Sequence, residues 1–188
     1  MPDPRDRFAV VAHRHGLLDR AGESPAGLPE RSLYSRDMAY RYAFARWWGP
    51  PDLALADAWV LLNPATGDTE QRRRPTLERC VERSRGDGRS GLVIVNLFAF
   101  RHTDPKTLRL AADAVGPAND DALRVLTRAA ARTIAAWGAG GRLLGRSAAV
   151  GPLLQSPLCL GSTRRGEPRH PLYVPGASGL VPWRPPAA

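Results

Sequence analysis

The stretch "GLVIVNLFAF", residues 91–100, decides the fold of this chain. It is an apolar run that begins at a glycine and contains one polar side chain, Asn96. A central strand of a parallel sheet is covered on both faces, so it is apolar along its whole length rather than at alternate positions. The run therefore predicts the central strand of an α/β protein. Asn96 within it must find hydrogen-bond partners.

Strand and helix patterns alternate on both sides of this run. Residues 39–48 alternate in polarity, which predicts a half-buried strand that forms a hairpin with the next strand through a long connection. The other expected elements are strands at 56–62, 134–138 and 157–161 and helices that start at Pro75 and Asp104-Pro105 or cover 116–133 and 145–154. This alternation predicts a three-layer α/β/α sandwich with a mainly parallel central sheet.

Length and composition predict one soluble domain. Residues 1–30 are rich in proline, glycine and charge, which predicts a loosely attached N-terminal segment followed by a single α/β domain over 31–188. The chain has no apolar stretch long enough for a membrane span and no secretory signal pattern. Two cysteines indicate no disulfide framework. We expect a cytoplasmic monomer that does not bind a membrane.

The net charge of +9 is carried almost entirely by arginine. A polyanionic partner such as nucleic acid would explain this balance, because arginine side chains neutralise phosphates. A genome that favours arginine codons over lysine codons would explain it equally well. Two local clusters, at 71–79 and 161–170, lie next to segments that the strand pattern marks as ligand-binding loops.

Neither a metal nor an organic cofactor is expected. His13 and His15 are two residues apart, which is unlike the spacing of helical or finger ligands, and the chain has no Cys/His cluster. Neither "GAGG" nor "GSTRRG" is a phosphate-binding P-loop, and no Gly-x-Gly-x-x-Gly follows the first apolar strand.

Four unusual segments follow the four apolar strands. They are "NPATGD" (63–68), "NLFAFRHTDP" (96–105), "WGAGG" (137–141) and "GSTRRGEPRHP" (161–171). In open α/β sheets the ligand site lies beyond the carboxyl ends of the parallel strands. The sequence therefore predicts a site built from these four segments.

Motifs in these segments resemble those of the uracil-DNA glycosylase superfamily. The motifs are Leu62-Asn63-Pro64, "VNLFAFRHTDP" (95–105), "AAWGAGGRLLGRSAAVGPLL" (135–154) and "RHPLYVP" (169–175). The chain is still more similar to a widespread bacterial domain of unknown function with "LNPST" and "VNLFA" motifs. In the last motif Leu172 stands where the glycosylases have serine.

The resemblance implies two catalytic residues for hydrolysis of an N-glycosidic bond. Asn63 would hold the attacking water, which is a positioning task that an amide can perform. His170 would donate a hydrogen bond to the departing base, on which negative charge develops. The residues alone leave other roles open, because Asn63 before a proline is also typical of an Asx turn and His170 could be a surface residue.

Further residues are candidates for binding the substrate. Asn96 would read a base edge or cap a turn, and Phe98 would stack on a base or pack in the core. Asp68 is a candidate for the general base of a variant mechanism. The remaining candidates come from the first motif and from the arginine clusters, where solvated surface charge is the alternative: Pro64, Thr66, Arg74, Arg164, Arg165 and Arg169.

The resemblance implies a DNA glycosylase-like hydrolase that removes a damaged or modified base. Such an enzyme must take the base out of the stack into a pocket. The first alternative is a non-catalytic module of the same fold that binds a modified base or an RNA. The second is a hydrolase of free nucleosides or nucleotides.

Overall fold

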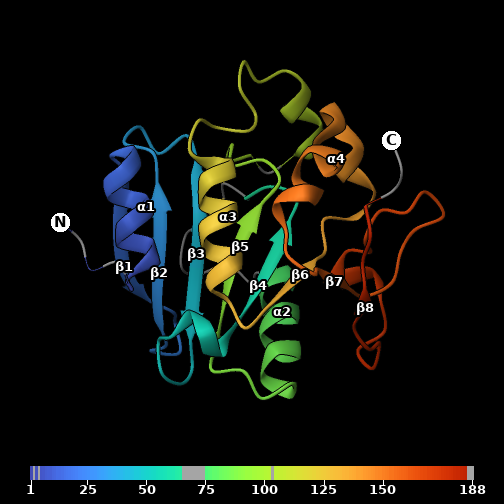
Figure 1. Ribbon diagram of the computed structural model, residues 1–188, viewed down its shortest axis with the longest axis horizontal. Coiled ribbons are helices and arrows are strands. Elements are labelled where there is room, and N and C mark those ends of the chain that lie inside the picture. The colour runs from blue at the N-terminus through green and yellow to red at the C-terminus, as the bar shows by residue number, and fades with distance from the viewer. Residues whose placement is uncertain (2, 4, 65–74, 103, 186–188) are drawn as a thin grey trace.

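The computed structural model describes the chain except residues 2, 4, 65–74, 103 and 186–188. The described residues form one eight-stranded sheet and four α-helices (Figure 1). The strands are β1 Leu18–Glu23, β2 Pro29–Tyr34, β3 Arg41–Trp47, β4 Ala56–Leu61, β5 Gly91–Asn96, β6 Arg132–Ala135, β7 Leu158–Cys159 and β8 Val181–Pro182. The helices are α1 Arg7–His15, α2 Pro75–Gly86, α3 Asn119–Ala129 and α4 Arg146–Val150. The strand order is β1-β2-β3-β5-β4-β6-β7-β8.

The sheet is mixed, and the prediction of a mainly parallel sheet is wrong. Three pairings are parallel, β5 with β4, β4 with β6 and β6 with β7. The other four are antiparallel. Strands β1, β2 and β3 follow one another through short connections, and such connections force neighbouring strands to run in opposite directions. The expected hairpin between 39–48 and 56–62 is also absent, because β5 lies between β3 and β4.

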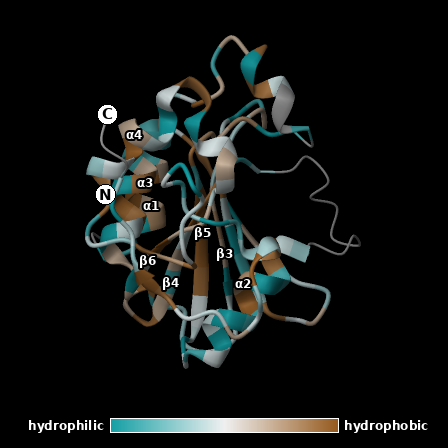
Figure 2. Ribbon diagram, turned by 90° about the vertical axis from the view of Figure 1, so that its right-hand side faces the viewer, coloured by the Kyte–Doolittle hydropathy of each residue, from teal (hydrophilic) through white to brown (hydrophobic). Residues whose placement is uncertain are grey.

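Strand β5 is the centre of the sheet, as the apolar run predicts. All six of its residues are buried, and it pairs with β3 on one side and β4 on the other. Helices lie against both faces of the sheet (Figure 2). Val93 and Val95 belong to the cluster that contains α1 and α3 residues, and Leu92 and Ile94 to the cluster that contains the apolar face of α2.

Strand β3 contains a bulge that the alternating pattern of residues 39–48 does not reveal. Leu33 pairs with Ala43 but Tyr34 pairs with Arg41, so Tyr42 is an extra residue in β3. A bulge of this kind re-aims neighbouring side chains. Tyr42 and Ala43 consequently both join the cluster on the α1 and α3 face. The strand is buried along its whole length instead of on one side, because Phe44 packs in the cluster on the other face.

The N-terminal segment is part of the fold, contrary to the expectation that residues 1–30 are loosely attached. Phe8 and Val11 of α1 are buried in the core cluster. Asp121 of α3 accepts hydrogen bonds from Arg14 Nη1 at 2.6 Å and pairs with His15 Nε2 at 2.9 Å. Strands β1 and β2 then extend the sheet beyond β3.

A buried ionic cluster lies at the sheet edge opposite the predicted site, where β4 begins. The carboxylate of Asp57 has no exposed surface. It accepts hydrogen bonds from Arg132 Nε at 2.7 Å, Arg132 Nη2 at 3.0 Å and Ser84 Oγ at 2.7 Å. The Ser84 hydroxyl accepts in turn from Trp59 Nε1 at 3.0 Å. This cluster joins β4, β6 and α2.

The two outermost strands differ from the central ones. Five of the six residues of β1 are exposed, among them Asp19, Arg20 and Glu23. Strand β8 has two residues, the second of which is Pro182.

Over the described ranges, no helix has the length and apolar character that a membrane span requires.

Candidate functional site

The carboxyl ends of the four parallel strands meet at one edge of the sheet. Leu61 at the end of β4 pairs with Asn96 at the end of β5, and Ala135 at the end of β6 pairs with Cys159 of β7. The segments that follow these strands therefore begin side by side. This is the arrangement that the sequence predicts for the site.

Asn63 is fixed by the loop that follows β5. Its side-chain Nδ2 donates to the carbonyl oxygen of His102 at 2.8 Å and to that of Pro64 at 3.3 Å. The backbone N–H of His102 donates to the carbonyl oxygen of Pro64 at 3.1 Å. Because carbonyl groups can only accept, these contacts identify which side-chain atom is the nitrogen. The amide oxygen of Asn63 is thereby held in one orientation.

Two close contacts connect this turn to the rest of the edge. A Cβ atom on Gly140 would lie 2.8 Å from Leu62 Cδ2, so the segment after β6 packs against the residue before Asn63. A Cβ atom on Gly138 would lie 3.2 Å from His170 Cβ, and Gly138 has a φ of +72°, which favours glycine. The Gly138 N–H donates to Pro168 O at 2.9 Å. The segment after β6 therefore contacts His170 and the residue that precedes Asn63.

His170 is half-buried at the start of a 3-10 helix, Pro171–Tyr173. Its Nδ1 caps this helix by accepting from the Leu172 N–H at 3.4 Å. A proton on Nδ1 would face that N–H, so the arrangement favours the neutral ring with its proton on Nε2. Burial acts in the same direction and lowers the pKa of His170 from its ordinary value of 6.5. Near neutral pH, His170 therefore offers an uncharged Nε2–H donor.

The lowered pKa of His170 makes stability depend on pH. The unfolded chain takes up a proton near pH 6.5 and the folded chain resists it, so the stabilisation is fully present above pH 6.5 and is lost as the pH falls through the lower, folded-state pKa. We expect urea unfolding at pH 7.5 and pH 5.5 to show a larger loss of stability for the native chain than for His170→Gln. An equal loss in both proteins would contradict this pKa direction.

Asn96 and Phe98 are both buried. Asn96 is 2% exposed, and its carbonyl oxygen accepts from Asn119 Nδ2 at 3.1 Å. Phe98 is fully buried in the cluster on the α1 and α3 face. Phe98 therefore packs in the core, and its prediction as a base-binding residue is wrong because its ring has no exposed surface. Pro64 is also buried and contributes its carbonyl group to the loop contact described above.

An aromatic series beside Asn63 was not predicted. The rings of Phe100 and His102 stack with centroids 6.4 Å apart, and the Tyr40 ring meets that of Phe100 edge-on at 5.8 Å. Tyr40 stacks on Tyr42 at 6.0 Å. The series extends from the buried Tyr42 to the loop that fixes Asn63, so it supports the position of that loop.

Glu167 is a second unpredicted residue of this edge. Its carboxylate is 1% exposed and accepts from Trp137 Nε1 at 2.7 Å and from Ser147 Oγ at 2.8 Å. These bonds join the segment after β7 to the end of β6 and to α4. The sequence signal was weak, because a glutamate between arginines in a loop is usually exposed.

The arginine candidates differ in what the structure says of them. Arg164, Arg165 and Arg169 are exposed, and Arg169 Nε donates to Ser162 O at 3.2 Å. Thr66, Asp68 and Arg74 lie outside the described residues. Within the part of the chain that the structure describes, no three His, Cys, Asp or Glu side chains gather as metal ligands would.

Comparisons with known proteins identify the family. The chain has no significant match among curated proteins or among solved structures. Residues 41–172 match the protein family described as "Protein of unknown function (DUF1643)". This range includes β3 to β7, both catalytic candidates and most of the segments that meet at the site edge. The chain therefore belongs to the DUF1643 family.

Proposed function

We propose that the protein is a uracil-DNA-glycosylase-like α/β sandwich that hydrolyses the N-glycosidic bond of a damaged or modified base in nucleic acid. The observation that carries the proposal is the placement of an oriented amide and a half-buried imidazole in two segments that follow parallel strands of the same sheet. Asn63 is held by His102 O at 2.8 Å, and His170 is held against Gly138 with its Nδ1 occupied by the Leu172 N–H. The likeness of four motifs to those of the glycosylases supports the same reaction.

The proposed chemistry assigns one task to each of the two residues. The Asn63 amide oxygen accepts a hydrogen bond from water and places it beneath the sugar carbon. The C–N bond breaks as positive charge develops on the sugar, and the departing base takes the electron pair. The neutral His170 donates Nε2–H to a base oxygen where negative charge grows. Water then adds to the sugar carbon, and its proton passes to the base or to solvent.

The test is an excision assay on oligonucleotides that contain uracil, hypoxanthine, xanthine or hydroxymethyluracil. Alkali cleaves the strand at each abasic site and reports excision. We expect Asn63→Ala and His170→Ala each to slow excision by about 10²-fold or more, because each removes an oriented group that acts in the transition state. The rate of the native chain should start to fall only at a pH lower than the ordinary histidine value of 6.5, because burial lowers the pKa of His170.

Two matched variants control for the loss of an amide or an imidazole elsewhere on the protein. Gln155→Ala removes an exposed amide and His13→Ala an exposed imidazole, and both should leave the excision rate unchanged. Thermal unfolding of all four variants separates loss of chemistry from loss of fold. If no base in the panel is excised while the oligonucleotides still bind, the protein is the non-catalytic binding module instead.

A further inference from the structure

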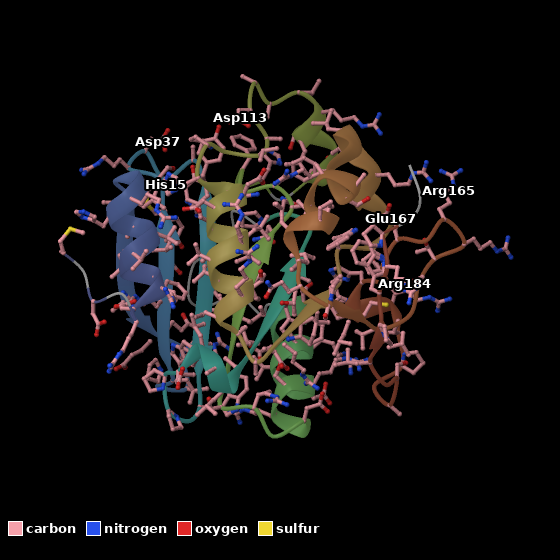
Figure 3. All side chains as sticks on the ribbon, viewed as in Figure 1. His15, Asp37, Asp113, Arg165, Glu167 and Arg184 are labelled. Carbon is pink, nitrogen blue, oxygen red and sulfur yellow. The ribbon has the colours of Figure 1, made fainter. Side chains whose placement is uncertain are left out.

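The positive charge of the protein is concentrated in its C-terminal third. Residues 122–188 contain nine arginines and one acidic residue, Glu167, which gives this segment a net charge of +8 out of +9 for the chain. Glu167 is buried, so it does not offset this charge at the surface. Figure 3 shows Arg165 and Arg184 at one end of the molecule, with His15 and Asp37 toward the other.

Among the residues that the structure describes, most of these arginines have no acidic partner. Three pair with carboxylates from the first part of the chain: Arg124 with Asp121, Arg132 with Asp57 and Arg146 with Asp120. Six others are exposed and make no ion pair among the described residues: Arg128, Arg142, Arg164, Arg165, Arg169 and Arg184. Exposed cations without partners are typical of a surface that binds a polyanion.

Two of the six lie at the tip of a rigid turn, which we call the arginine turn (residues 163–166). The Gly166 N–H donates to Thr163 O at 3.0 Å and the Thr163 N–H to Glu167 O at 2.7 Å. Trp183 Nε1 donates to Gly166 O at 3.0 Å, and the buried Glu167 carboxylate anchors the base of the turn. Arg164 and Arg165 therefore project from a fixed backbone, which lowers the entropic cost of binding through them.

An exposed aromatic ring, that of Tyr173, follows the arginine turn in the chain. Tyr173 is 80% exposed, the ring centroid of His170 lies 5.5 Å away, and the Tyr173 N–H donates to His170 O at 3.0 Å. A large ring in contact with water, a few residues along the chain from exposed arginines, is suited to stacking on a nucleobase. The rings of a base pair inside a duplex are already stacked on their neighbours, so a ring presented in this way serves an unpaired base.

We propose that the protein binds single-stranded nucleic acid along residues 161–173, with Arg164 and Arg165 of the arginine turn on the phosphates and Tyr173 stacked on an unpaired base. This inference rests on the proposed function and specifies the strandedness of its substrate. It places the bound strand beside His170, because Tyr173 and His170 share one 3-10 turn.

The test is fluorescence anisotropy with a labelled single strand of about 12 nucleotides and a duplex of the same sequence and length, over a range of salt concentrations. We expect the single strand to bind more tightly. The double variant Arg164→Ala/Arg165→Ala should bind it about tenfold or more weakly. Its log Kd should also depend less steeply on log salt, by about 1.4, because two phosphate contacts on a single strand are lost.

The matched control is Arg20→Ala/Arg36→Ala, which removes two exposed arginines from the other end of the molecule. It should leave binding nearly unchanged, and an equal loss in both double variants would overturn the arginine turn as the site. Tyr173→Ala should weaken binding of the normal strand but not of a fully abasic strand. Tighter binding of the duplex than of the single strand would overturn the proposal. A Tyr173→Ala variant that binds the normal strand as tightly as the native chain does would also overturn it.

Binding and excision are separate readouts, so the two proposals can fail independently. A protein that binds single strands through the arginine turn but excises no base retains this inference and loses the glycosylase. If the native protein excises bases but the Arg164→Ala/Arg165→Ala variant binds the single strand normally, the glycosylase proposal stands and this inference is lost.

Discussion

Asp57→Ala is expected to lower the free energy of unfolding by about 3–5 kcal/mol, which is the range for breaking a buried ion pair on one side. The carboxylate is fully buried and receives both the Nε and Nη2 groups of Arg132. Its removal leaves that guanidinium with only the half-exposed Asp87 as counter-ion, and it leaves the Ser84 hydroxyl without its acceptor. Urea unfolding at pH 7 measures the loss.

Two further variants show whether the buried position of Asp57 is the cause. Asp52→Ala removes an exposed carboxylate five residues earlier, whose side chain accepts from the Ala54 N–H, and should cost about 1 kcal/mol or less. Asp57→Asn keeps the volume and one acceptor oxygen, so its cost should lie between the other two. If Asp57→Ala unfolds at the same urea concentration as Asp52→Ala, the ionic cluster does not stabilise the fold.

Glu167→Ala is expected to cost about 3 kcal/mol of stability and to weaken nucleic-acid binding. The variant leaves Trp137 Nε1 and Ser147 Oγ without their partners, and each unsatisfied buried group costs about 1–3 kcal/mol. It also opens a cavity at the base of the arginine turn. Thermal unfolding measures the first effect, and anisotropy with the single strand measures the second.

Glu167→Gln separates the hydrogen bonds from the charge. The glutamine oxygen can accept from Trp137, and the Ser147 hydroxyl can rotate to accept from the new amide, so we expect most of the stability and binding to return. Recovery in Glu167→Gln would show that Glu167 acts as an anchor of the turn. A variant Glu167→Ala that melts like the native chain would contradict the role given to the buried carboxylate.

The parts of the fold that the sequence predicts are those where burial is strong. Residues 91–100 predict β5 because every position is apolar, and Pro75 with Leu77, Cys80 and Val81 predicts α2 and its buried face. Strand β1 could not be recognised, because an edge strand with exposed residues reads as a polar loop. Helix α1 has nine residues and lies in a charged segment, so its apolar face became clear only from the burial of Phe8 and Val11 in the core.

The candidate site likewise has parts that the sequence predicts and parts that it does not. The positions of Asn63 and His170 at one edge were predictable, because parallel strands place their carboxyl ends together. The partners of Glu167 were not, since Trp137 and Ser147 lie 30 and 20 residues away in the chain. The bulge at Tyr42 was equally hidden, because one inserted residue changes the face of a strand without changing its composition.

The two outer strands have a consequence for the behaviour of the protein at high concentration. An exposed strand edge is a template on which another chain can add a strand, and such addition leads to aggregation. Strand β1 carries Asp19, Arg20 and Glu23 on exposed positions, and β8 is two residues long and ends in Pro182, which has no N–H to offer. Both edges are therefore poor templates, so the sheet should not grow into fibrils even though its centre is among the most apolar parts of the chain.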